Sequence, residues 1–163
     1  VGSEMCIRDR AYYCAYYSIR ANAFDYEKMA MGRERLEYYI NDYKAKKADG
    51  TISNVEDDEL KDMRIVQEMY ARGYEFWTID LYKAQASRFQ IIDGKLMPAL
   101  STIDGLGEKA AEAVVEAAKD GPFLSKDDFR QRTKVSKTVI DLMGDLGLFG
   151  DLPESNQLSL FDF

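Results

Sequence analysis

The feature that most constrains the fold is a three-residue turn, Gly105-Leu106-Gly107, between two apolar segments. Its two glycines can adopt left-handed dihedrals and let the backbone approach a bulky group closely. We expect Leu106 to point back and lock the turn between its flanking helices. The following helix should begin at Glu108, where unpaired N–H groups form an anion site. The turn therefore predicts a site for a phosphate of duplex DNA, with Lys109 close enough to contribute.

This arrangement resembles the helix-hairpin-helix motif, and a degenerate second copy follows within residues 129–149. Lys134-Val135-Ser136 takes the place of the turn, and Lys137 to Met143 should supply the following helix. The missing glycines argue against a second phosphate site, whereas the local charge argues for one. Four basic residues lie here with no acid between them: Arg130, Arg132, Lys134 and Lys137. A solvated helix end would explain them, but the neighbouring motif favours contact with the DNA backbone. Tandem motifs contact both strands without reading bases, so we expect sequence-independent binding.

The net charge of −7 limits how the chain can contact nucleic acid. Binding to a phosphate backbone is carried by Lys and Arg, so any contact with DNA should be local. The sequence has no histidine, which excludes serine triads and His-ligated zinc sites on this chain. Hydrophobic residues make up 46% of it, too many for a disordered chain, yet no apolar run reaches the ~20 residues of a membrane span. We expect a soluble cytoplasmic protein with no membrane partner.

No group of residues in the sequence predicts a metal site. Cys6 and Cys14 are too few for a four-sulfur site and favour a reducing compartment over a disulfide framework. The run Asp57-Asp58-Glu59 lies near an expected helix start, where acids favour the positive end of the helix dipole. Glu112 and Glu116 should form a solvated helix face. We expect no cofactor on this chain.

The first ten residues are expected to be foreign to the protein. Glu4 to Arg10 read EMCIRDR, which resembles one translated frame of the transposase end sequence used to prepare sequencing libraries. Residues 1–10 are therefore predicted to be an adapter scar, and the chain to be a fragment without its native start. The alternative is a genuine helix start with a basic end.

Three helices are expected before residue 74. Residues 11–21, AYYCAYYSIRA, are dense in aromatic and small side chains, which suits a helix buried in a larger body. A second helix should begin after Asp25 and reach Lys47 with one apolar face. A third should run from Val55 to Arg72, with Gly73 as its stop.

A small β-hairpin and three further helices are expected after residue 74. Asp93-Gly94 between apolar runs predicts two short strands, at residues 88–92 and 95–100. Helices should follow at residues 108–119, 126–132 and 136–146. The fold class is therefore mainly α with a small β-hairpin, and the end of the chain should be a disordered tail.

The tail contains a short motif, Gln157-Leu158-Ser159-Leu160-Phe161. It is similar to the pentapeptide by which bacterial polymerases and repair proteins bind the DNA sliding clamp, where Gln orients the peptide and the Leu-Phe pair fills an apolar pocket. Burying Leu160 and Phe161 contributes roughly 2 to 3 kcal/mol each. After the cost of ordering the tail, binding should be about micromolar, which suffices for a tethered contact. The alternative is a terminus that folds back onto its own domain.

The two hairpins and the terminal pentapeptide, in this order, resemble the C-terminal end of the DNA polymerase III alpha subunit of the PolC type. Further matches are AYYSIRA, DLYKAQASRF and DGPFLSKDDFRQRTKVSKTVID. The resemblance implies that residues 11–73 are the helical end of a fingers region. Residues 74–152 would then be a tandem helix-hairpin-helix module that binds duplex DNA, and residues 153–163 a tail that binds the clamp (beta subunit).

The same resemblance implies processive DNA-directed DNA synthesis by the parent nucleotidyltransferase, with other replisome subunits as possible partners. The catalytic carboxylates of the family, and the Mg²⁺ they are expected to use, lie upstream, so no catalytic residue is expected on this chain. A non-catalytic repair adaptor with tandem hairpins and a clamp-binding tail is the alternative. The fingers-like residues 11–72 distinguish the two classes, because an adaptor has no need of them.

Overall fold

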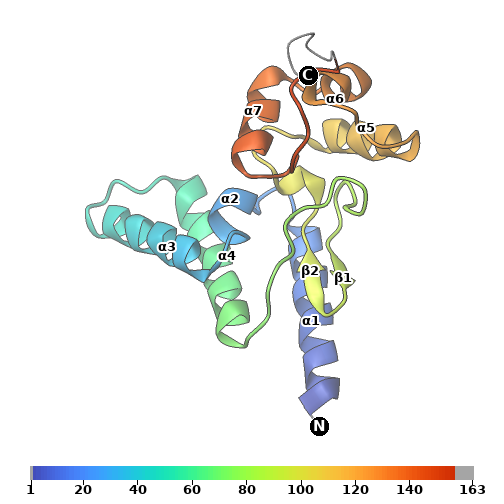
Figure 1. Ribbon diagram of the computed structural model, residues 1–163. Helices are drawn as coiled ribbons and strands as arrows, with labels where there is room; N and C mark the ends of the chain where they lie inside the picture. The colour runs from blue at the N-terminus through green and yellow to red at the C-terminus, as the bar shows by residue number, and fades with distance from the viewer. Residues whose placement is uncertain (1, 157–163) are drawn as a thin grey trace.

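A computed structural model of the chain describes residues 2–156, and the clamp motif at residues 157–161 lies outside this range (Figure 1). The elements are α1 (Gly2–Ile19), α2 (Tyr26–Met29), α3 (Arg33–Ala48), α4 (Asn54–Ala71), β1 (Gln90–Ile92), β2 (Lys95–Met97), the 3-10 helix η1 (Leu100–Thr102), α5 (Glu108–Lys119), α6 (Lys126–Thr133) and α7 (Lys137–Asp145). The predicted mainly α fold with a small β-hairpin is confirmed. Three groups of elements meet near η1 in Figure 1: α1 with the hairpin, α2 to α4, and α5 to α7. No helix in the described part is long and apolar enough to cross a membrane.

The first helix, α1, is longer than predicted and is buried along one side. Tyr13 and Tyr17 are almost fully buried, whereas Tyr12 and Ile19 are 59% and 86% exposed. The predicted helix within residues 11–21 is confirmed, although α1 already begins at Gly2. The adapter scar at residues 1–10 stays a prediction, and so does the domain boundary at residue 73.

An aromatic cluster joins α1 to the segments that precede α2 and follow α4 in the sequence. Its members are Tyr17, Phe24, Phe76 and Phe89, with ring centroids 5.0 to 6.2 Å apart. The backbone of Phe89 is also held by α1, since its N–H donates to the Ser18 hydroxyl at 2.9 Å and its carbonyl accepts from the Cys14 thiol at 3.2 Å. Segments far apart in the sequence therefore share one core, and its packing is dominated by large aromatic side chains.

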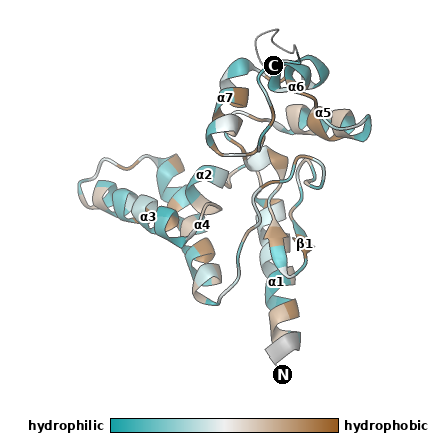
Figure 2. Cartoon of the chain, viewed as in Figure 1, coloured by the Kyte–Doolittle hydropathy of each residue, from teal (hydrophilic) through white to brown (hydrophobic). Residues whose placement is uncertain are grey.

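The predicted helix from Asp25 to Lys47 is wrong in one respect, because the chain breaks it into α2 and α3. Asp25 caps α2 as predicted, its carboxylate accepting from the Lys28 N–H at 3.1 Å. The break lies at Gly32, whose φ of 104° is strained for residues with a side chain. α3 then buries one apolar face through Leu36, Ile40 and Tyr43, and the rest of it is mostly hydrophilic (Figure 2).

The helix α4 has a complete capping box at its start. The Ser53 hydroxyl accepts from the Glu56 N–H at 3.1 Å, and the Glu56 carboxylate accepts from the Ser53 N–H at 3.2 Å. Lys46 of α3 forms an ion pair with Glu56 at 2.7 Å and, together with the bonds to Ser53, lowers the pKa of this carboxyl to about 2. Gly73 ends the helix with a φ of 89°, as predicted.

The β-hairpin has the predicted turn and shorter strands. Asp93 and Gly94 both have positive φ, at 48° and 80°, as a two-residue hairpin turn requires. Ile91 pairs with Leu96 in an antiparallel register. The preceding segment adds an edge contact, because the Trp77 N–H donates to the Leu96 carbonyl at 2.8 Å.

Glu56→Gln should make the free energy of unfolding less dependent on pH in the acid range. Folding lowers the pKa of Glu56 from 4.5 to about 2. A carboxyl with a lowered pKa stabilises the fold while ionised, so its contribution is present above about pH 4.5 and is lost as pH falls to about 2. Gln retains the backbone bond of the capping box.

Urea unfolding at a series of pH values checks this prediction. The variant should lose less stability between pH 4.5 and 2 than the unchanged chain. Glu116→Gln on α5 is the control for removing a surface carboxyl. Equal losses in the unchanged chain and the Glu56 variant would contradict the role of Glu56.

Candidate DNA interface

The first predicted turn is present, with a left-handed residue, a buried apolar residue and a helix cap in succession. Gly105 has a φ of 82°, and a Cβ there would lie 3.0 Å from Cγ2 of Val139 in α7. The left-handed φ favours glycine here, and the close approach of α7 leaves little room for a Cβ. Leu106 is 2% exposed, which confirms that it locks the turn. Gly107 is the N-cap of α5 and has no side chain, so the N–H groups at the helix start donate no hydrogen bond to a capping side chain.

The element before this turn is shorter than the motif predicts. η1 is a single 3-10 turn rather than a full helix, and all three of its residues are buried. The Thr102 hydroxyl donates to the Ala99 carbonyl at 2.6 Å, which closes η1 locally. The helix after the turn, α5, has the predicted bounds, and Lys109 lies exposed at its second position.

The second turn has the same backbone geometry without the glycines. Lys134 is left-handed, with a φ of 62°, and occupies the position that Gly105 has in the first turn. Val135 follows it into the core and is 4% exposed. Ser136 caps α7 with φ and ψ of −66° and 152°, close to the −68° and 172° of the α5 cap. Loss of the glycines has therefore not removed the second hairpin.

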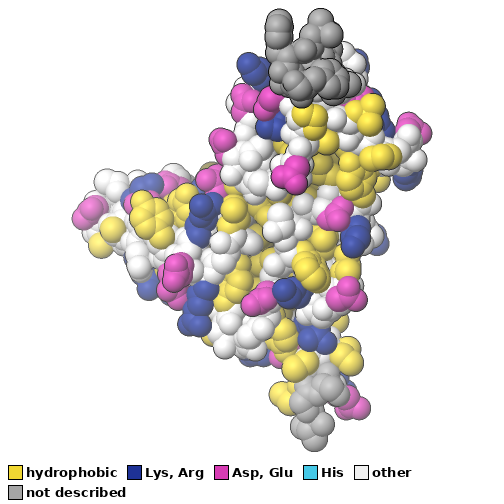
Figure 3. All heavy atoms as spheres, in the orientation of Figure 1, with side chains coloured by type: hydrophobic (Ala, Val, Ile, Leu, Met, Phe, Trp, Pro, Cys, Tyr) yellow, Lys and Arg dark blue, Asp and Glu magenta, His cyan; other side chains and the backbone are white. Residues whose placement is uncertain are grey.

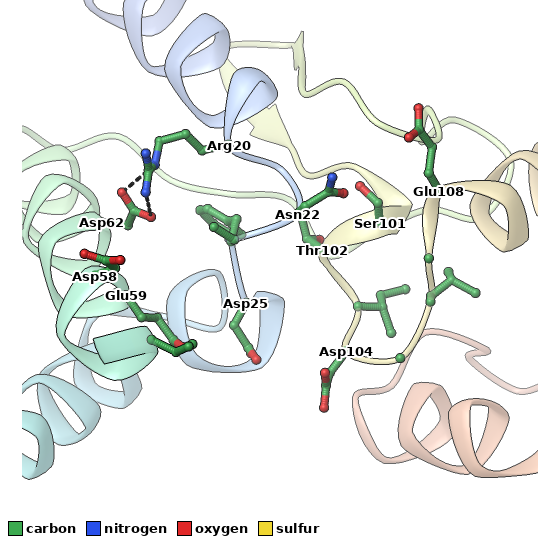
Figure 4. Close-up of a pocket in the computed structure, with 17 residues that line it drawn as sticks. Arg20, Asn22, Asp25, Asp58, Glu59, Asp62, Ser101, Thr102, Asp104 and Glu108 are labelled. Carbon is green, nitrogen blue, oxygen red and sulfur yellow. Dashed lines mark hydrogen bonds and ion pairs between the residues drawn. The ribbon is translucent and has the colours of Figure 1, made fainter. Parts of the chain in front are cut away.

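The first turn borders an acidic hollow between α4, the start of α2 and η1 (Figure 4). Its lining includes one cation, Arg20, which is paired with Asp62 at 2.8 Å. Burial raises the pKa of the Asp25 carboxyl, which also lines the hollow. The acidic residues of the lining are Asp25, Asp58, Glu59, Asp62, Asp104 and Glu108. Because two of them flank the turn directly, a phosphate there would meet repulsion as well as the helix dipole.

A smaller hollow at the second turn has the opposite character. Arg130, Lys134 and Ser136 line it, with Asp127 as its one acid. Within residues 2–156, Arg130, Lys134 and Lys137 form no ion pair with a carboxylate. On the face seen in Figure 3, basic and acidic side chains are interspersed, so the cationic character is local.

The guanidinium of Arg132 is bonded within the protein, and its predicted contact with DNA stays a prediction. Its guanidinium donates to the carbonyls of Ala117 and Gly121 at 2.6 and 2.9 Å and to the Asp128 carboxylate at 3.2 Å. It also lies 4.5 Å above the ring of Phe123. Arg132 therefore closes the end of α5 and fastens it to α6. Charge pattern alone does not reveal the direction in which a side chain points.

The described start of the predicted tail packs against α6. The carbonyls of Pro153 and Glu154 accept from the N–H groups of Lys126 and Asp127 at 2.8 and 3.0 Å. The Lys126 ammonium pairs with the Glu154 carboxylate at 2.8 Å, and Ser125 is hydrogen-bonded to Asn156. The first four residues of the segment assigned to the tail, 153–156, are therefore held against the start of α6.

The three consecutive acids near the start of α4 each form an ion pair with a different lysine. Asp57 pairs with Lys47 at 3.0 Å, Asp58 with Lys61 at 3.4 Å, and Glu59 with Lys28 at 3.0 Å. In the described part of the chain, no group of three or more cysteine or acidic side chains is arranged to hold a metal ion.

Arg132→Met should lower the free energy of unfolding by about 2 kcal/mol, because carbonyls at the end of α5 lose a charged donor. Arg130→Met removes an exposed guanidinium from the same helix and should change stability by less than about 0.5 kcal/mol. Urea unfolding of both variants checks the pair. Equal effects would contradict the structural role of Arg132.

The sequence is similar to one protein family and to several curated proteins. The family model for the helix-hairpin-helix motif matches residues 73–158. The DNA polymerase III PolC-type of Streptococcus pneumoniae serotype 2 is 44% identical over 151 residues, which are 93% of this chain and 10% of that protein. The corresponding proteins of Streptococcus suis and Streptococcus pyogenes are 45% and 42% identical over the same length. The chain thus spans about a tenth of these curated relatives. The predicted resemblance to the PolC type is confirmed, and the chain belongs to the helix-hairpin-helix family.

Proposed function

We propose that this chain is the part of a PolC-type replicative polymerase that holds nascent duplex DNA and the sliding clamp. The observation that carries the proposal is the repeated turn. Gly105 and Lys134 are both left-handed, each is followed by a buried apolar residue, and each turn ends at the cap of a helix. Two such helix starts side by side offer N–H groups to phosphates of both strands.

The two hairpins support one another as a single binding unit. Val139 of α7 lies against Gly105, so the second helix of one motif packs on the turn of the other. Phe123, Phe129 and Phe149 fill the space between α5, α6 and the end of α7, with ring centroids 4.8 and 5.0 Å apart. A rigid spacing between two phosphate sites favours duplex DNA over a flexible single strand, because both contacts are positioned in advance.

The clamp contact is proposed for residues 157–161. The anchored residues 153–156 support this role, since Ser125 and Lys126 of the hairpin module hold the chain immediately before Gln157. A contact of about micromolar strength becomes intramolecular once the module is on DNA, and this raises its effective strength. DNA synthesis, its Mg²⁺ and contacts with other replisome subunits in the cytoplasm belong to the proposed parent enzyme.

A repair adaptor remains the second candidate function, and the packing of α1 to α4 argues against it. These helices are joined to the hairpin module through the core around Phe89. An adaptor needs only the hairpins and the tail. The relatives are polymerases by name, in line with the first candidate.

Gly107→Val should weaken duplex binding by the same factor for every base sequence. Residue 107 has ordinary dihedrals, and a Cβ there meets no atom within 4 Å, so the fold tolerates the change while the side chain blocks a phosphate. Fluorescence anisotropy with A·T-rich and G·C-rich duplexes checks this expectation, and Gly107→Ser, which copies the second turn, is the milder control. A loss confined to one sequence would show that the hairpin reads bases.

Replacing Leu160 and Phe161 with Ala should abolish capture of the chain by immobilised sliding clamp. Each side chain contributes roughly 2 to 3 kcal/mol on burial, which is most of the strength of a micromolar peptide. Asp162→Asn, directly after the motif, is the matched control and should retain binding. Clamp capture by the doubly substituted chain would refute the docking assignment.

A further inference from the structure

The two turns share a backbone and differ in their electrostatic surroundings. Gly105 and Lys134 have φ values of 82° and 62°, and the two caps that follow differ by 2° in φ and 20° in ψ. A difference in phosphate binding between the hairpins must therefore come from charge and from local hydrogen bonding rather than from turn conformation.

The first turn has little positive charge to offer a phosphate. Asp104 precedes Gly105, Glu108 begins α5, and both line the acidic hollow. The cation of that hollow, Arg20, is already neutralised by Asp62. Lys109 is the one basic side chain beside the turn in the sequence. The attraction left to this turn comes mainly from neutral N–H groups and the helix dipole.

The second turn places several unpaired cations around the same kind of helix start. Lys134 is in the turn itself, Lys137 begins α7, and Arg130 lines the adjoining hollow. All three are exposed, and none forms an ion pair within residues 2–156. Ser136 accepts from the Val139 N–H at 3.4 Å and leaves the earlier N–H groups of the helix without a side-chain partner. Asp127 is the one acid of this hollow.

We propose that the second hairpin, which lacks the glycines, is the stronger phosphate grip and supplies most of the salt-dependent binding to duplex DNA. The glycine hairpin contributes a contact that depends little on salt. The two strands of the duplex are therefore held unequally, one by charge and one by backbone dipoles. This inference rests on the proposed function, because it divides a duplex contact between the two hairpins.

Lys134→Gly gives the sharpest test, because it removes the charge and supplies the residue best suited to a left-handed φ. If turn conformation governed binding, this variant would bind duplex DNA as well as the unchanged chain or better. We expect it to bind about tenfold more weakly at ~50 mM salt, since one counterion-releasing contact is lost. The slope of log affinity against log salt should fall in magnitude by about 0.9.

The experiment measures fluorescence anisotropy of a labelled short duplex with the full 163-residue chain at several salt concentrations. Lys137→Gln, at an exposed position in the first turn of α7, should lower the slope by a similar amount and serves as the second variant. Lys109→Gln on the first hairpin should change it less. Lys44→Gln, at an exposed position on α3, is the control for net charge and should leave the slope unchanged. Circular dichroism melting confirms that each variant is folded.

The outcomes separate the inference from the proposed function. Unchanged slopes for Lys134→Gly and Lys137→Gln, with a lowered slope for Lys109→Gln, would overturn the unequal grip and leave duplex binding intact. Absence of duplex binding by the unchanged chain at low salt would overturn the proposed function, and the inference with it.

Discussion

The structure depends on the contact between α1 and the aromatic residues that precede the two strands. Tyr17, Phe24, Phe76 and Phe89 pack edge to face or tilted, the arrangement in which aromatic pairs add about 0.5 to 1.5 kcal/mol each beyond burial. Phe89 is also bonded through its backbone to α1. The chain leaves this cluster through the β-hairpin and enters η1, so the cluster sets the place at which the Gly105-Leu106-Gly107 turn begins. The acidic hollow follows from the same arrangement, because it brings α4 and the start of α2 next to that turn.

Two further contacts make the hairpins one unit. Gly105 lies against Val139, which leaves no room for a side chain at residue 105, and Arg132 bonds the end of α5 to α6 through carbonyls and Asp128. Tyr82 links this unit to the β-hairpin side, since its hydroxyl accepts from the Phe123 N–H at 3.0 Å and its ring stacks on that of Phe123. The positions of the two turns are therefore determined by buried contacts, while the charges that distinguish them lie on the surface.

Local sequence signals predicted those elements whose cause is itself local. Asp93-Gly94 placed the β-hairpin turn, Asp25 placed a cap, and the apolar spacing of α5 gave its observed bounds. The break at Gly32 was missed because the apolar face continues in step across it, from Met29 to Leu36. The helix-hairpin-helix motif implies a helix before the first turn, whereas the structure has only the 3-10 turn η1 there, with all three of its residues buried. The aromatic density of residues 11–21 correctly indicated burial, and only the structure shows which side is covered.

The sequence by itself determined the helical class, the order of the two motifs and the presence of a basic cluster, because each of these depends only on residue type and on spacing along the chain. Tertiary structure alone decided which members of that cluster face outward. Arg132 donates hydrogen bonds within the module. Lys134 instead adopts a left-handed φ and forms a hairpin turn in which the sequence has no glycine. Packing of Val135 and of the α7 cap holds that conformation in place of glycine. Direction and pairing of side chains depend on contacts between distant segments, and spacing along the chain does not encode them.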